Sequence, residues 1–143
     1  MSCLLRICGH SFSWALFTFL LLGHVQALAE WVALDAHHQS HGLQTVYIDL
    51  STLRRDGQLA TMVTLIDWKW MQGNRSPMRF YSTTLTKQFD CMGNRMRLLA
   101  FTDFYGHMGT GRRVASYGSE ASWSPIEPES LNHVLWEMAC RRG

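Results

Sequence analysis

The sequence predicts an α+β fold, in which a six-stranded antiparallel sheet is followed by one C-terminal helix that packs on one face. Three observations predict this fold. Side chains alternate between two faces along the better-defined segments, turn residues separate these segments at short intervals, and the period of the apolar residues changes near the C-terminus. No repeat, low-complexity tract or long linker divides residues 30–143, so we expect them to form one domain.

The predicted strands are separated by turn signals. Asp56-Gly57 marks a turn, and Gly93-Asn94 has the spacing of a tight antiparallel hairpin. The glycines within residues 106–111 mark a further turn. Short polar turns between successive strands predict antiparallel pairing of the neighbours. The predicted strands are Trp31–Leu34, Thr45–Asp49, Leu59–Trp70, Arg79–Asp90, Arg95–Tyr105 and Arg112–Tyr117.

Two segments lie outside the predicted strands. Residues 51–55 form either one helical turn or an irregular loop, and the sequence leaves both open. The C-terminal helix begins at Pro128 or Ser130 and carries one apolar face at helical spacing. That face consists of Leu131, Val134, Leu135 and Met138.

The first 29 residues have the order of a secretory signal peptide. Arg6 precedes the apolar run Phe12–Leu22, and the small residues Ala27 and Ala29 follow it. Polar residues interrupt this run before it reaches the roughly 20 apolar residues that a membrane-spanning helix needs. We therefore expect cleavage after Ala29 and no membrane span in the mature chain.

Cys91 and Cys140 are the only cysteines in residues 30–143. An exported domain folds in an oxidising environment, so we expect this pair to form one disulfide; two buried free thiols are the alternative. The bond would close a loop of about 50 residues and contribute about 4 kcal/mol in the chain-entropy model. Because the helix ends near Cys140, the bond would pin the helix across the sheet.

The predicted strand over residues 59–70 carries apolar side chains on both faces. Met62 and Ile66 point one way, whereas Val63 and Leu65 point the other. One helix of about three turns can cover only one face. The second face must be covered by curling of the sheet, by pairing of two chains, or by a ligand or partner. This surplus of apolar surface indicates a binding function.

Several short motifs follow one another between residues 31 and 140. They are Trp31, Tyr47-Ile48-Asp49, Leu53-Arg54-Arg55-Asp56-Gly57, Phe89-Asp90-Cys91, Arg95-Met96-Arg97, Met108-Gly109-x-Gly111, Trp123-x-Pro125-Ile126, Pro128-x-Ser130 and Ala139-Cys140. In order and spacing the chain resembles the surface-adhesin protein E family. The resemblance implies a sheet whose concave face carries the disulfide-tethered helix, a bacterial cell-envelope location, and adhesion to host proteins.

The predicted cleavage site bears on the location of the mature protein. A lipid anchor requires a cysteine directly after the signal sequence, whereas Glu30 follows Ala29 here. Cys3 and Cys8 lie before the apolar run and cannot serve. We therefore expect the exported protein in the periplasm or at the cell surface, without a lipid-anchor cysteine.

Trp68 and Trp70 are predicted to point to the same face of one strand, close to a loop. With Tyr81 or Phe104 they could form an aromatic platform for a flat apolar ligand such as a haem, for a sugar, or for the side chains of a partner. The alternative is packing in the core, because a six-stranded sheet needs large side chains.

His37, His38 and His41 form a dense cluster, and imidazoles at this spacing can bind zinc or copper. The surrounding loop contains Ser and Gly, and Asp35 is the one nearby carboxylate. A histidine cluster without supporting carboxylates seldom makes a tight site, so we interpret the segment as a polar loop and expect no metal.

Composition and motifs also argue against several classes of protein. The chain is 47% hydrophobic and 17% charged with a net charge of +2, which is typical of a globular domain and leaves no basic excess for nucleic acid. The glycines of residues 106–111 precede two arginines, not the Lys-Ser/Thr of a phosphate-binding loop. We find no nucleophile elbow and no carboxylate pair, so we expect no enzyme and no cofactor.

The leading hypothesis is an exported, non-enzymatic, adhesin-like module that binds a protein partner, such as a host extracellular-matrix protein, through its sheet. The exposed sheet could also bind a second copy of the chain, giving a homodimer. The alternative is a periplasmic binder of an aromatic or haem-like small ligand. A metal-dependent enzyme that uses the three histidines is the third hypothesis.

Overall fold

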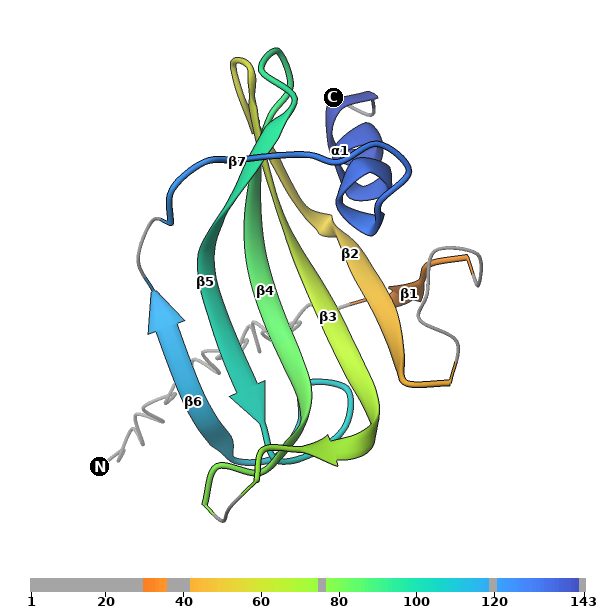
Figure 1. Ribbon diagram of the computed structural model, residues 1–143, viewed down its shortest axis with the longest axis vertical. Helices are drawn as coiled ribbons and strands as arrows, with labels where there is room; N and C mark the ends of the chain where they lie inside the picture. The colour runs from red at the N-terminus through yellow and green to blue at the C-terminus, as the bar shows by residue number, and fades with distance from the viewer. Residues whose placement is uncertain (1–29, 36–41, 75–76, 119–120, 142–143) are drawn as a thin grey trace, which may run out of the picture.

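The computed structural model describes residues 30–35, 42–74, 77–118 and 121–141, which form one antiparallel sheet and one helix (Figure 1). The sheet has the order β1-β2-β3-β4-β5-β6, and β7 pairs with β5, which gives seven strands where six were expected. The antiparallel order and the C-terminal helix are confirmed. The elements are β1 (Val32–Ala33), β2 (Gln44–Asp56), β3 (Leu59–Gln72), β4 (Phe80–Asp90), β5 (Arg95–Phe104), β6 (Arg113–Gly118), β7 (Ser124–Pro125) and α1 (Leu131–Arg141).

Residues 51–55 are neither a helical turn nor a loop but part of β2. The pairing with β3 shifts in register after Asp49, as in a β-bulge. The buried carboxylate of Asp49 accepts hydrogen bonds from the backbone and the hydroxyl of Ser51, at 3.0 and 2.6 Å. The hydroxyl of Thr52 accepts a bond from the backbone N–H of Val63 at 2.9 Å. Side chains thus replace ladder partners, and the strand continues through the irregularity.

The turn between β4 and β5 is the hairpin expected at Gly93-Asn94, and Asp90 organises it. Its carboxylate accepts bonds from the N–H of Gly93 at 2.9 Å, the N–H of Met92 at 3.1 Å and Nε of Arg95 at 2.9 Å. The Gly93 bond, followed by the Arg95 and Met92 bonds, outweighs burial and lowers the pKa of Asp90. The positive φ of 46° falls at Asn94, a residue type that tolerates this region.

α1 packs on one face of the sheet, near one of its ends (Figure 1). Leu135 and Ala139 are fully buried in the same core as Met62 of β3 and Phe89 of β4. The helix begins at Leu131, after Ser130, whose hydroxyl accepts a bond from the N–H of His133 at 3.2 Å. Of the predicted apolar face, Leu131 and Met138 pack against this core together with Leu135, whereas Val134 lines a hollow beside the helix.

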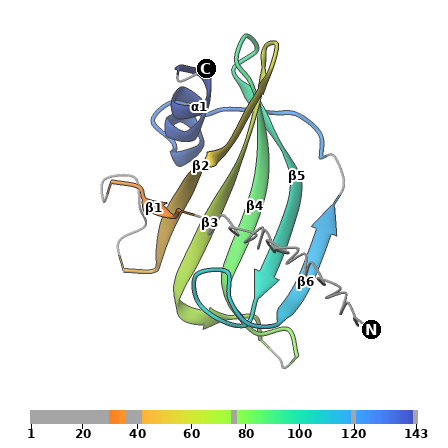
Figure 2. The ribbon, with the colours of Figure 1, turned by 180° about the vertical axis from the view of Figure 1, so that it is seen from behind.

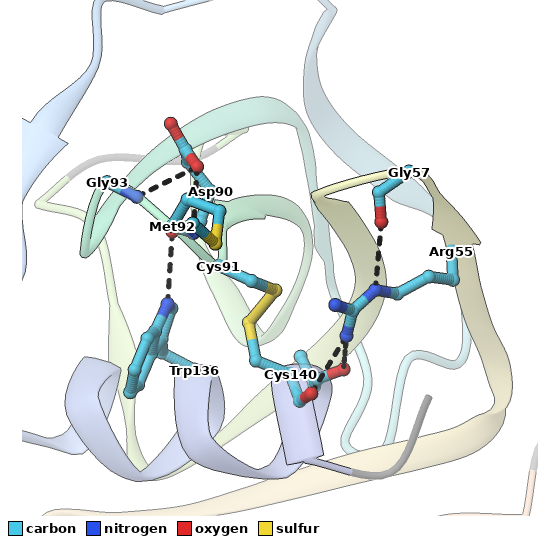
Figure 3. The surroundings of a disulfide bond; sticks show 9 residues. Arg55, Gly57, Asp90, Cys91, Met92, Gly93, Trp136 and Cys140 are labelled. Atoms are coloured by element: carbon cyan, nitrogen blue, oxygen red, sulfur yellow. Dashed lines mark hydrogen bonds between the residues drawn. A yellow bond between two sulfur atoms is a disulfide. The ribbon is translucent and has the colours of Figure 1, made fainter.

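The disulfide between Cys91 and Cys140 forms as predicted and joins the end of β4 to the last turns of α1, with their Cα atoms 5.5 Å apart (Figure 3). Two hydrogen bonds support this link. Arg55 donates to the carbonyl of Cys140 at 2.8 Å and so satisfies an orphan carbonyl at the helix C-terminus. The indole of Trp136 donates to the carbonyl of Asp90 at 3.1 Å. The helix is thus held covalently and by hydrogen bonds from two strand ends.

The opposite face of the sheet is covered at Leu65 by the chain itself. Leu65 is fully buried and points away from α1, because it has the opposite parity to Met62 on β3. The loop between β5 and β6 crosses this face over β3 and β4 (Figure 2). A β-carbon on Gly109 of that loop would lie 3.4 Å from Leu65, so the backbone packs directly on the leucine. Here neither a curled sheet nor a second molecule is needed.

Lys87 lies on the α1 side of β4, opposite Met62 of β3 and Leu98 of β5. It is buried, and its ammonium donates to the side-chain carbonyl of Asn132 on α1 at 2.8 Å. Burial lowers the pKa of Lys87 from 10.5 to about 8, because the low-dielectric interior disfavours the charged form. A cation is therefore held under the helix at a cost to stability.

This burial predicts a specific dependence of stability on pH. Because the folded pKa lies below the unfolded one, the unfolded chain binds more protons between pH 8 and 10.5, and stability rises across that window. Lys87→Met, which removes the buried charge, should be more stable than the wild type at pH 7, and this advantage should shrink by about 3 kcal/mol by pH 10.5. Urea unfolding at several pH values measures the difference. Lys69→Met, at an exposed lysine, is the matched control; an advantage of Lys87→Met that stays constant with pH would contradict the prediction.

Candidate functional site

The two ends of the sheet differ in what covers them (Figure 1). At the helix end lie α1, the disulfide and the turns after β2 and β4. At the open end β2, β4 and β6 begin and β3 and β5 end, and the described residues place no helix there. Four large apolar side chains are exposed at the open end, and we call them the rim. The rim consists of Leu43 (59% exposed), Trp70 (63%), Met78 (52%) and Tyr105 (49%).

Strand pairing and one tight turn bring the rim residues to the same end. The N–H of Lys69 donates to the carbonyl of Leu43 at 3.0 Å, which places the start of β2 beside the end of β3. A side chain at Gly73, where φ is +82°, would collide with the carbonyl oxygen of Met78. Only glycine allows this approach. Met78 is therefore folded back toward β3.

The loop over residues 106–111 carries Tyr105 at its base and is fixed by side chains of the sheet. The carboxylate of Asp67 accepts a bond from the N–H of Met108 at 2.8 Å and contacts Nδ1 of His107 at 3.2 Å. The hydroxyl of Ser82 accepts a bond from the N–H of Gly109 at 2.9 Å. These backbone amides are thus satisfied internally, which agrees with a structural turn and not with a phosphate-binding loop.

Basic side chains lie beside the two aromatic rings of the rim. The ammonium of Lys69 lies 5.5 Å from the ring centre of Trp70. The guanidinium of Arg112 lies 5.8 Å from the ring centre of Tyr105. Both distances fall within the range of a cation–π contact. The open end therefore offers exposed aromatic faces with positive charge next to them.

The predicted aromatic platform is divided between two faces. The indole N–H of Trp68 points at the hydroxyl of Thr83, at 3.5 Å, on the face that α1 partly covers. Phe104 lies opposite Ser82, one residue earlier on β4, and so belongs to the other face. The ring of Tyr81 packs on His107, with centroids 4.4 Å apart. All three, like Trp70, lie at the open end.

Several predicted residues lie outside the described ones. These are the signal-peptide positions Ala27 and Ala29 and the histidines His37, His38 and His41. Within the described ranges, no three His, Cys, Asp or Glu side chains are grouped in a way that could hold a metal ion. In the same ranges no helix is long and apolar enough to cross a membrane.

Comparison with known proteins decides the family. The model of the family described as surface-adhesin protein E matches residues 31–141, which is most of the chain. The chain belongs to this family. Membership supports an adhesin-like surface protein that is exported from the cell, and it suggests a non-enzymatic role. No curated protein matches the sequence significantly.

Solved structures of Haemophilus influenzae protein E have the same fold as this member of the surface-adhesin protein E family. Crystal form II is 13% identical with a TM-score of 0.58, covering 78% of this chain and 97% of that one. Another structure is 12% identical with a TM-score of 0.57, covering 78% and 94%. Protein E from non-typeable Haemophilus influenzae is 13% identical with a TM-score of 0.57, covering 78% of this chain and 84% of that one. At this identity the likeness concerns the fold alone.

The size and place of a hollow along α1 bear on the alternative function, which is the binding of an aromatic or haem-like small ligand. It has a volume of about 210 Å³ and is lined by Val134, Glu137, Met138 and Arg141. Pockets for drug-sized ligands usually measure about 300–1,000 Å³. The hollow is smaller than that and lies at the helix end, away from the tryptophans of β3. It gives no support to a haem-like ligand.

Sequence reasoning found Trp70 but missed Leu43, Met78 and Tyr105. Each of these lies next to a turn signal: Leu43 follows Gly42, Met78 follows Pro77, and Tyr105 precedes Gly106. A large apolar residue beside a turn could have been noticed, since such positions are poorly covered. Their gathering at one end depends on the strand order, which a list of segments does not supply.

The loop contacts predict the effect of removing the Asp67 carboxylate. Asp67→Ala should speed hydrogen exchange at the Met108 amide and lower the free energy of unfolding by about 1 kcal/mol, because a partly buried hydrogen bond is lost. Hydrogen exchange followed by NMR, with urea unfolding, measures both. Asp56→Ala removes an exposed carboxylate at the other end of the sheet and should change neither. Unchanged exchange at Met108 in Asp67→Ala would show that the carboxylate does not hold the loop.

Proposed function

We propose that this protein is an exported, non-enzymatic adhesin-type module that binds a protein partner through the rim at the open end of its sheet. The observation that carries the proposal is the exposure of Leu43, Trp70, Met78 and Tyr105 together at that end. Large apolar side chains left exposed together at one end of a domain are typical of an interaction site. Membership in an adhesin family supports the same function.

The physical character of the rim suits protein recognition. Trp and Tyr dominate the binding energy of protein interfaces, because their large rings bury much area with few rotatable bonds. Trp70 lies on a strand, and Tyr105 lies between β5 and a loop that Asp67 and Ser82 hold in place. Binding would therefore order little of the backbone, which favours affinity.

The proposal includes the route to the partner. We propose that residues 1–29 are removed as a signal peptide and that residues 30–143 function in the periplasm or at the cell surface, without a lipid-anchor cysteine. The disulfide between Cys91 and Cys140 supports export, because such bonds persist in oxidising compartments. A host extracellular-matrix protein is the expected partner class if the protein reaches the surface.

The rim predicts which substitutions abolish binding. In surface plasmon resonance against purified extracellular-matrix proteins, Trp70→Ser combined with Tyr105→Ser should weaken binding at least about tenfold, because each ring is an anchor. Val32→Ser combined with Met92→Ser removes two exposed apolar side chains outside the rim and should bind like the wild type. Equal loss in both double variants would remove the assignment to the rim. If no matrix protein binds, the proposal that the partner is a host extracellular-matrix protein is contradicted.

Export makes a separate prediction. Protein recovered from the envelope of the producing bacterium should have the mass of residues 30–143 with one disulfide, as measured by intact mass spectrometry. Antibody labelling of intact and permeabilised cells then separates the cell surface from the periplasm. A retained leader or two free thiols would contradict export.

A further inference from the structure

At the helix end, every Lys and Arg among the described residues is engaged within the protein. Each makes a hydrogen bond to a carboxylate, an amide or a backbone carbonyl. They are Arg54 to Ser51, Arg55 to Cys140, Lys87 to Asn132, Arg95 to Asp90, Arg97 to Gln88 and Arg141 to Glu137. These side chains stabilise turns, the helix terminus and cross-strand pairs, so each is held in place by the fold.

The basic side chains of the open end are not held by polar contacts of this kind. Lys69, Arg79, Arg112 and Arg113 are all exposed, and within the described ranges none of them has an ion pair or a side-chain hydrogen bond. Lys69 and Arg112 only lie beside the rings of Trp70 and Tyr105. Strand order places Arg79 before β4 and Arg113 at the start of β6, at the same end of the sheet as these rings.

Among the described residues, the carboxylates of the open end form no ion pairs with these four cations. Asp67 is bonded to the loop at His107 and Met108. Asp103 accepts a bond from the hydroxyl of Thr83 at 2.7 Å. Asp35, the third described carboxylate near this end, also has an interaction partner. The acidic groups are thus held by the fold, whereas the cations face solvent around the rim.

From this charge distribution we infer that the partner segment is acidic, with apolar side chains between its carboxylates. The inference rests on the proposed function and specifies the chemistry of the partner at the same site. Exposed cations around an apolar centre match carboxylates around apolar anchors, which gives specificity and a faster association. A polyanion such as heparin or nucleic acid would use the cations but leave the apolar rim uncovered, so an acidic protein segment is favoured.

Three synthetic peptides test this chemistry by fluorescence anisotropy. The first alternates Glu with Leu and Phe, the second has Lys in place of Glu, and the third has Ser in place of Leu and Phe. The first should bind, more weakly as salt rises because exposed charges are screened. The other two should bind at least about tenfold more weakly. Equal binding of the second peptide, or tighter binding of heparin than of the first peptide, would overturn the inference.

Matched variants assign the binding to the open end. Lys69→Gln combined with Arg79→Gln should weaken the first peptide by about tenfold, the effect of losing roughly 1.4 kcal/mol. Arg54→Gln combined with Arg141→Gln removes the same charge at the helix end and should have no effect beyond general screening. Equal loss in the two pairs would overturn the inference. If Trp70→Ser with Tyr105→Ser abolishes binding of a matrix protein and the cation variants keep it, the rim function stands and the acidic partner fails.

Discussion

Apolar side chains on both faces of a single sheet impose the constraint on which this structure depends. A sheet of this kind cannot fold alone in water, because each face needs a cover. The chain supplies both covers from its own later segments. α1 closes one face over Met62 and Phe89, and the loop after β5 closes the other over Leu65. α1 lies at one end of the sheet and the loop lies at the open end, where the rim is exposed (Figures 1 and 2).

Polar contacts hold both covers of the sheet, and they have different effects at the helix end and at the open end. At the helix end, Asp90 organises a turn and its carbonyl receives the indole of Trp136 (Figure 3). At the open end, Asp67 and Ser82 fix the loop over residues 106–111, while the rings of Trp70 and Tyr105 stay exposed to solvent. The same kind of hydrogen bond thus builds the core at one end and positions a surface at the other.

Local patterns predicted the strands and the disulfide well, because alternation, turn residues and a lone cysteine pair are local or compositional signals. The failures concern long-range contacts. Residues 51–55 belong to a strand because Asp49 and Thr52 supply the missing ladder partners, and no local pattern encodes that exchange. The predicted helix face included Leu131, Leu135 and Met138, which pack on the core, but it missed the buried Ala139. Trp68 and Phe104 were expected to be able to share a platform, yet the register of β4 with β5 separates them.

The separation of 49 residues between Cys91 and Cys140 has a mechanical consequence for a member of an adhesin family. A pulling force can straighten a polypeptide only where no cross-link bridges it. The covalent loop encloses β5, β6, β7 and most of α1. About 49 residues, or roughly 170 Å of contour length, are therefore withheld from extension. When tension acts between the two ends of the domain, the molecule can lengthen only through the chain outside this loop, so β5, β6 and β7 are not drawn out.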